Sequence, residues 1–146
     1  MVDVGIKADT LRTATASGTV YLGREVFELV RADRMKKGDV LRVAQLAGIM
    51  GAKQTSLLIP LCHNIPLNKV SVKLSLDASA AAVDILAEAR TSGKTGVEME
   101  ALTAVSIAAL TVYDMCKAAS KDICITDIKL QAKSGGQSGD YSRDSS

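Results

Sequence analysis

The 146-residue sequence contains no Trp, one Phe and three Tyr, so its core must be built from aliphatic side chains. Single-stranded nucleic acids bind by stacking on aromatic side chains, and nucleic-acid-binding domains are strongly basic. With few aromatics and a formal net charge of only +2, we expect no nucleic-acid partner. Any anion site must therefore come from a local cluster of Lys and Arg. The composition, 47% hydrophobic and 23% charged, is ordinary for one soluble domain.

Long apolar segments and a disulfide framework are also missing. No apolar run reaches the roughly 18 residues that a membrane helix needs, and the first ten residues lack the apolar core of a signal peptide. We therefore expect no membrane association and a cytoplasmic protein, or a protein of the mitochondrial matrix if the source is eukaryotic. Three widely spaced cysteines, at 62, 116 and 124, are typical of a reducing compartment. No Cys and His spacing indicates a structural zinc site.

The only histidine lies in the segment 59–67, between the two prolines. Each proline restricts its own backbone and that of the preceding residue, so this segment is expected to be a stiff, non-helical connector. His is the side chain best suited to proton transfer near neutral pH, and loops on a rigid scaffold often carry function. His63 is therefore a candidate for the chemistry. The alternative is a partly buried His in a turn.

Hydrophobic periodicity predicts strands at residues 11–22, 69–76, 82–90 and 122–130, and helices at 23–35, 40–58 and 97–120. Gly18 indicates a bulge or a close approach in the first strand, and a break in alternation indicates a bulge near 126–127 in the last. Gly38 is expected to end the first helix, and Asp39 to cap the second.

The two longer helices are expected to pack closely. The second carries an apolar stripe, made up of Val40, Val43, Ala44, Ala47 and Met50. Gly48 and Gly51 weaken this helix by about 1 kcal/mol each relative to Ala, which indicates that another backbone lies against them. The Ala-rich helix 97–120 is expected to be the most buried element.

Treating the first two helices as one crossover gives the order βαββαβ, which is the ferredoxin-like α+β arrangement: an antiparallel sheet with helices on one face. The other sheet face would be exposed in a monomer, so we expect oligomerisation through it or through an edge. We expect a single domain over residues 1–146, with flexible ends at about 1–10 and 134–146. The glycine-rich end is either a disordered tail or a loop that closes over an anion.

The helix 97–120 carries two sets of charged side chains. Glu98 and Glu100 lie in its first turn, where the helix dipole favours carboxylates, but they point to different sides, so capping does not explain both. Asp114 and Lys117 are three residues apart and can touch. Because the helix is otherwise apolar, we expect this pair to be partly buried, and such a pair can exchange protons. The alternative is a surface ion pair.

Several cations adjoin glycine-containing breaks and would form an anion cradle if they converged; they are Arg12, Lys36, Lys37, Lys53 and Lys133. The segment Gly93-Lys94-Thr95-Gly96 is not a P-loop, because Glu88 stands where that motif needs a glycine.

Six motifs together resemble the MoaC family of molybdenum cofactor biosynthesis, over most of the chain from about Arg12 to Gly139. They are KKGDV at 36–40, QLAG at 45–48, IPLCH at 59–63, TGVEMEALT at 95–103, YDMCKA at 113–118 and KSGG at 133–136. Each motif is modest alone, but six in the same order are specific. The chain departs from many relatives at Asn64, where they have Pro, and at Gly51, where they have Ala; neither change removes a catalytic group.

The resemblance implies a lyase that converts (8S)-3′,8-cyclo-7,8-dihydroguanosine 5′-triphosphate into cyclic pyranopterin monophosphate and releases pyrophosphate. It implies that Asp114, Lys117 and Lys37 are catalytic. Residues implied to bind the substrate are Leu61, Cys62, His63, Glu98, Met99, Glu100, Lys133, Arg12 and Lys53. No metal site or redox cofactor is implied, and Mg²⁺ accompanying the phosphates is left open. The family also implies a hexamer, a trimer of dimers, with active sites shared between two subunits.

Two alternatives to this lyase are a non-catalytic ferredoxin-like module that binds a nucleotide or phosphate, and a regulatory subunit that senses a nucleotide. The chain retains the acidic, basic and histidine side chains of the family's motifs, which argues against loss of the chemistry.

Overall fold

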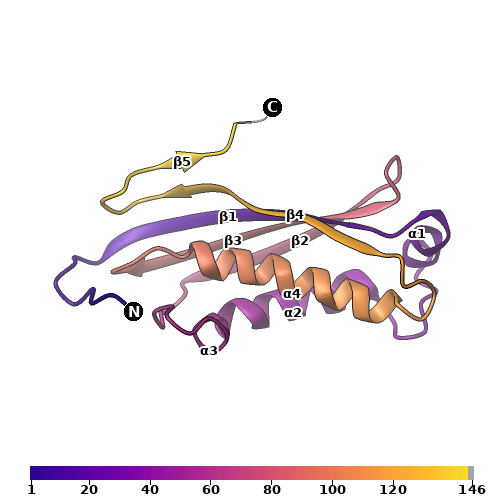
Figure 1. Ribbon diagram of the computed structural model, residues 1–146, viewed down its shortest axis with the longest axis horizontal. Helices are drawn as coiled ribbons and strands as arrows, with labels where there is room; N and C mark the ends of the chain where they lie inside the picture. Colours follow the sequence, from indigo (N-terminus) through magenta and orange to yellow (C-terminus); the bar gives the residue numbers. More distant parts are fainter. Residues whose placement is uncertain (145–146) are drawn as a thin grey trace.

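The computed structural model describes residues 1–144, which form a five-stranded antiparallel sheet with helices on one face (Figure 1). The strands, in the spatial order β2-β3-β1-β4-β5, are β1 (Thr10–Tyr21), β2 (Lys69–Asp77), β3 (Ala82–Gly93), β4 (Cys124–Ser134) and β5 (Tyr141–Ser142). The helices are α1 (Arg24–Arg31), α2 (Val40–Lys53), α3 (Thr55–Leu58) and α4 (Glu98–Cys116). This confirms the ferredoxin-like α+β fold, with β5 as an added edge strand.

The central strand β1 presents small or aliphatic side chains to the helices. Ala14, Ala16 and Val20 are buried, and they alternate with half-buried Thr and Ser on the open face. Gly18 lies so close to α4 that a Cβ there would be 2.8 Å from Val105 Cγ1. The β1–β4 register shifts beside Gly18, where Asp127 has a φ of 58°. Both the close approach and the bulge near 126–127 are thus confirmed.

The first helix is shorter than the sequence predicted. α1 ends at Arg31, because the backbone turns into the left-handed region at Asp33, with a φ of 55°. Gly38 therefore does not end this helix, as expected, but lies in the turn that leads into α2, with a φ of 108°. The predicted cap of α2 is confirmed, since the Asp39 carboxylate accepts from the Arg42 N–H at 3.2 Å.

The second helix faces the core with only part of the predicted stripe. Val40 and Ala44 are buried as predicted, whereas Val43 and Met50 are 43% and 57% exposed. The buried row of α2 is completed by Gly48, Gly51 and Ala52. The glycines decide the rotation of the helix, because small residues let α2 approach α4 more closely than a row of larger side chains would. The predicted helix 40–58 is also divided at Gln54 into α2 and α3.

Helix α4 packs on β1, β3 and β4 and lies beside α2, which packs on β2 (Figure 1). A Cβ at Gly48 would be 2.8 Å from the carbonyl oxygen of Ala104, which confirms the predicted close packing. By length and composition alone, α4 is the one helix among the described residues that could cross a membrane. However, 56% of that apolar window is buried inside the molecule, as expected for a core helix.

The glycine-rich end of the chain forms a hairpin over its described part. β4 continues to Ser134, past the predicted end at 130, and β5 pairs with it through Lys133↔Tyr141 and Ala132↔Ser142. The turn between them, residues 135–140, lies against β1. Residues 145–146 of the predicted flexible end lie outside the described part of the chain.

Candidate active site

The charged residues singled out in the sequence lie at the two ends of α4. Glu98 and Glu100 are in its first turn, beside the connector 59–67, whereas Asp114 is in its last turn, beside the loop that precedes α2. Glu98 and Asp114 are sixteen residues apart on one helix, which corresponds to about 24 Å. One chain therefore presents two separate clusters of candidate side chains.

The first cluster consists of Asp114 between two lysines. Lys37 Nζ lies 2.9 Å from Asp114 Oδ2, and Lys117 Nζ lies 3.2 Å from Oδ1. Hydrogen bonding by Lys37, and then by Lys117, holds the pKa of Asp114 below its usual value. The carboxylate is ionised at neutral pH and accepts from two proton donors.

The sequence predicted that the Asp114–Lys117 pair would be partly buried, and in one chain this is wrong. All three side chains are about half exposed, because Asp114 and Lys117 lie on the opposite side of α4 from the buried Val112, Met115 and Cys116. The i, i+3 contact itself is confirmed. Lys37 joins the pair because Gly38 turns the loop back toward α4.

The second cluster is centred on Glu100, which is only 3% exposed. Its Oε2 accepts from the Cys62 thiol at 3.9 Å, while Oε1 has no hydrogen-bond partner within the described residues. Burial raises the pKa of the Glu100 carboxyl, and the charge of Glu98 acts in the same direction. Burial, and then the charge of Glu100, raises the pKa of the Cys62 thiol. A buried acceptor without a partner is suited to bind a polar group of a ligand.

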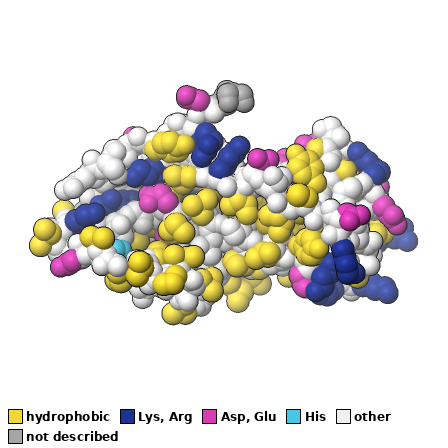
Figure 2. Space-filling view, viewed as in Figure 1, with side chains coloured by type: hydrophobic (Ala, Val, Ile, Leu, Met, Phe, Trp, Pro, Cys, Tyr) yellow, Lys and Arg dark blue, Asp and Glu magenta, His cyan; other side chains and the backbone are white. Residues whose placement is uncertain are grey.

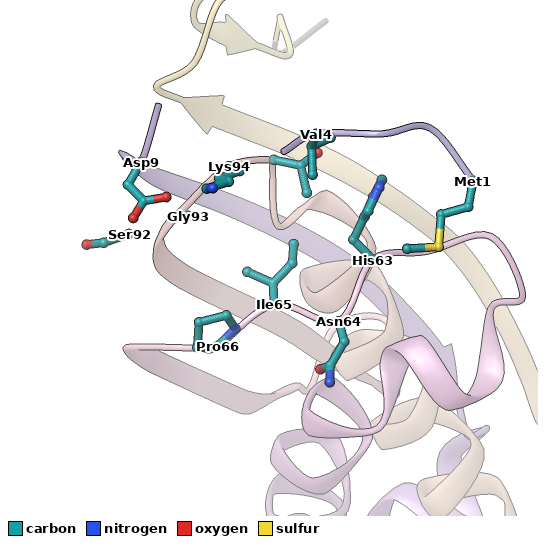
Figure 3. Close-up of a pocket in the computed structure, with 11 residues that line it drawn as sticks. Met1, Val4, Asp9, His63, Asn64, Ile65, Pro66, Ser92, Gly93 and Lys94 are labelled. Atoms are coloured by element: carbon teal, nitrogen blue, oxygen red, sulfur yellow. The ribbon is translucent and has the colours of Figure 1, made fainter. Parts of the chain in front are cut away.

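His63 lies on the stiff connector, next to this cluster. Thr91 Oγ1 donates to the carbonyl of Pro66 at 2.5 Å, which holds the connector on the end of β3. The His63 ring contacts the carbonyl of Val2, and in Figure 3 it points toward the N-terminal arm, whereas Asn64 points the opposite way. This side of His63 lines a cavity of about 400 Å³ together with Lys94 of the following loop.

A second hollow lies on the α4 side of the connector. It has a volume of about 300 Å³, and the predicted site residues that line it are Leu61, Cys62, His63, Glu98 and Met99. Five of the predicted substrate-binding residues therefore meet at one surface, and Glu100 lies beside them through Cys62.

A polar pocket of about 240 Å³ adjoins that hollow through Glu98. Arg12 and Lys133 line it, so two of the five candidate anion-binding cations do converge. Lys7 lines the same pocket and was missed by sequence analysis. The signal for Lys7 was weak, because it lies in an irregular arm where no periodicity indicates which side chains face inward.

The other predicted cations do not join this pocket within one chain. Lys36 and Lys37 lie at the far end of α4, and Lys53 is the exposed last residue of α2. No ion pair to Lys53 is found within residues 1–144. The five cations therefore do not converge into one cradle within a single chain, because Arg12 and Lys133 lie near the start of α4 and Lys37 lies near its end. Within the same residues, no three His, Cys, Asp or Glu side chains are arranged to hold a metal ion.

Comparison with known proteins identifies the family to which the sequence is similar. The model described as "MoaC family" matches residues 1–136. The chain is 64% identical over 143 residues to a protein of Arabidopsis thaliana named cyclic pyranopterin monophosphate synthase, mitochondrial; the match covers 98% of this chain and 53% of that protein.

Two further relatives differ in length. Molybdenum cofactor biosynthesis protein 1 of Homo sapiens is 57% identical, with 98% of this chain and 22% of that protein covered. Cyclic pyranopterin monophosphate synthase of Peptoclostridium acidaminophilum is 57% identical, with 99% of this chain and 91% of that protein covered. The chain thus spans about half of the plant relative, about a fifth of the human one and most of the bacterial one.

Proposed function

The chain belongs to the MoaC family, and from this premise we propose that it is a lyase that forms cyclic pyranopterin monophosphate. The proposed substrate is (8S)-3′,8-cyclo-7,8-dihydroguanosine 5′-triphosphate, and pyrophosphate is the second product. The observation that carries the proposal is the pair of clusters at the two ends of α4. At one end, the Asp114 carboxylate lies between two proton donors. At the other end, a pocket lined by Arg12, Lys7 and Lys133 adjoins the Glu100 cluster.

The reaction needs a cradle for a triphosphate and groups that move protons. Arg12, Lys133 and Lys7 supply positive charge around one pocket, and a guanidinium can bind phosphate oxygens with two hydrogen bonds. The adjoining hollow, with Leu61, His63 and Met99, would hold the purine-derived part of the substrate. Glu100 would accept a hydrogen bond from the substrate on its unpartnered oxygen.

Asp114, Lys117 and Lys37 are the proposed proton-transfer groups. In the free cluster the carboxylate is a weak base, because both lysines stabilise its charge. Closing the cluster off from water would make the charged carboxylate of Asp114 less favourable, which raises its pKa toward the range that acid–base catalysis uses.

A complete site requires both clusters, and about 24 Å of helix is too far for one nucleotide to bridge. We therefore propose that a second copy of the chain supplies one of the two clusters, in a hexamer built as a trimer of dimers. Exposed apolar side chains on the helix layer support such a contact, since a patch of this kind usually marks an interface. Figure 2 shows hydrophobic side chains spread over the face that it presents. The exposed apolar residues of the helices and of the connector after α3 include Val43, Leu46, Met50, Leu57, Leu58, Leu61 and Leu110.

The sequence led us to expect contacts through the open sheet face or an edge. The exposed apolar surface favours the helix layer instead, because the open face of β1 is rich in Thr and Ser. We propose no resident metal or redox cofactor, and Mg²⁺ bound to the substrate phosphates remains compatible with the pocket. For the compartment we propose the cytoplasm in bacteria or the mitochondrial matrix in eukaryotes.

Incubation of the protein with the cyclised triphosphate, with pyrophosphate as the readout, tests the enzyme against the non-catalytic binding module. We expect stoichiometric release of pyrophosphate from the wild type. Asp114→Asn should lose at least about a hundredfold in rate, as expected for a group that transfers a proton. The variant should keep its oligomeric state, because Asp114 is exposed and contributes no core contact. Binding of the triphosphate without any release of pyrophosphate would support the binding module instead.

A further inference from the structure

Arg12 is a buried cation without an acidic partner. The residue is only 8% exposed, and no carboxylate lies within ion-pair distance of it among residues 1–144. Its Nε donates to the carbonyl of Gly93 at 3.0 Å, and its Nη2 donates to that of Lys94 at 3.3 Å. These two bonds hold the guanidinium in one orientation at the end of β3. They leave Nη1 without a hydrogen bond inside the described chain.

The β4–β5 turn covers the Nη1 side of this guanidinium. A Cβ built on Gly136 would lie less than 3.0 Å from Arg12 Nη1, which real Cβ atoms essentially never do. The turn is itself held in place, because Gly135 N–H donates to Asp140 Oδ1 at 3.2 Å and Lys133 Nζ donates to Ser138 Oγ at 2.8 Å. A side chain at 136 could therefore be accommodated only if Arg12 moved.

Arg12 lines two adjoining pockets. Arg12, Gly136, Lys7 and Gln137 line a hollow of about 210 Å³, next to the pocket that Arg12 shares with Lys133. A buried guanidinium with one unused edge, flanked by two lysines, is suited to bind phosphate oxygens.

We propose that Gly136 is a positioning residue that acts through Arg12. By lacking a side chain, it lets the guanidinium stay on the Gly93 and Lys94 carbonyls while Nη1 faces the polyphosphate of the substrate. This inference rests on the proposed function for the identity of the substrate. The contact between Gly136 and Arg12 does not depend on it.

Gly139 offers a matched control in the same turn. Both glycines have a positive φ, 84° at Gly136 and 75° at Gly139, so an alanine strains the backbone similarly at either position. A Cβ at Gly139 would meet nothing within 4 Å. Gly136→Ala and Gly139→Ala therefore differ in one respect, the contact with Arg12.

The experiment measures steady-state kinetics with the cyclised triphosphate and calorimetric binding of inorganic pyrophosphate. For Gly136→Ala we expect KM and the pyrophosphate Kd to rise about tenfold, the effect of losing one charge-assisted hydrogen bond, with kcat changed much less. Gly139→Ala should stay within about twofold of the wild type in both measurements, because it touches nothing in the pocket.

Repeating the Gly136→Ala substitution in an Arg12→Lys variant shows whether its effect on KM and Kd depends on Arg12. Arg12→Lys lacks the Nη1 atom that the new methyl group would meet. Adding Gly136→Ala to it should cause no further rise in either constant, a non-additivity typical of residues in contact. This double variant also keeps the test informative if Gly136→Ala alone assembles poorly.

The proposal would be overturned if Gly136→Ala and Gly139→Ala raised KM and the pyrophosphate Kd equally. It would also be overturned if Gly136→Ala raised both constants about tenfold in the Arg12→Lys variant. Failure of the wild type to bind pyrophosphate would overturn it as well. If the wild type binds pyrophosphate with the expected difference between the variants but never releases it from the triphosphate, the positioning role stands and the proposed reaction fails.

Discussion

Glu100 shows how a single residue can be placed for binding at a cost to the fold. The motif around it in the sequence indicated a role for the carboxylate, and the structure adds that the residue is buried beside a thiol with one oxygen unpartnered. Leaving a buried polar atom without a hydrogen bond costs about 1–3 kcal/mol. Such a cost is typical of sites where a ligand completes the hydrogen bonding.

We predict that Glu100→Gln is more stable than the wild type at pH 7 and less active. The pKa of Glu100 is raised in the folded protein, so the folded state resists ionisation more than the unfolded chain does. This unfavourable contribution begins as the pH rises through the unfolded pKa, about 4.3, and is complete above the folded pKa. A neutral side chain removes it, which should raise the free energy of unfolding by about 1 kcal/mol at pH 7.

Thermal unfolding of both proteins across a pH series checks this prediction. The difference in Tm that comes from ionisation should be largest at neutral pH and should vanish toward about pH 3, where Glu100 is protonated in both states. A wild type that is more stable than Glu100→Gln at pH 7 would mean that the carboxylate has a stabilising partner after all.

At the scale of elements, the contact between α2 and α4 determines how the helix layer sits on the sheet. α2 packs with its row of small residues, and its larger Val43 and Met50 side chains remain outside. Sequence periodicity added Val43 and Met50 to the predicted stripe and left Gly48 and Gly51 out of it, because hydrophobicity scales give glycine little weight. The presence of Gly48 and Gly51 was the better signal, since glycine is unfavourable in a helix unless close packing requires it.

Gly48→Ala tests this contact, because packing and helix propensity predict changes of opposite sign in the free energy of unfolding. Helix propensity alone would make the alanine variant about 1 kcal/mol more stable. A Cβ at position 48, however, would be 2.8 Å from the Ala104 carbonyl oxygen, and a backbone atom in a packed helix cannot move aside. We expect a loss of about 1–3 kcal/mol, the usual cost of overpacking. Urea unfolding with a fitted midpoint and slope measures it, and a gain in stability would show that α2 shifts freely on α4.

For the whole molecule, the decisive feature is that the Asp114 cluster and the Arg12 pocket lie at opposite ends of α4. In one chain neither cluster has the complementary set of groups that the proposed reaction needs. The proposed shared sites would resolve this, because a twofold contact between antiparallel helices brings one end of each chain to the other end of its partner.

Mixing two inactive variants tests the shared site. Asp114→Asn and Glu98→Gln, each expected to be nearly inactive alone, should regain activity when unfolded together and reassembled. If each site takes one cluster from each of two chains, random pairing makes half of the dimers mixed, and one of the two sites in each mixed dimer is intact. Activity should therefore recover to about a quarter of the wild-type value. A mixture as inactive as its components, with mixed oligomers demonstrated, would mean that each site is built from one chain.

Much of this molecule was determined by local sequence. The sequence alone predicted three features that depend only on neighbouring residues. They are the alternation of buried and exposed side chains in residues 69–76, the connector bracketed by prolines and the Asp39 cap of α2. The six motifs identified the family and the candidate site residues in the same way. The ferredoxin-like order followed from the succession of elements, because few topologies connect them without crossing.

Tertiary structure decided what depends on residues far apart in the chain. Four features depend on contacts between segments that are distant in the sequence, which no local sequence pattern reveals. They are the rotation of α2, the exposure of Asp114, the separation of the two clusters and the contact of Gly136 with Arg12. Periodicity reports which side of an element is apolar, but not how closely its neighbour can approach. Packing distances set by small residues determined those arrangements, and with them which side chains can meet a substrate.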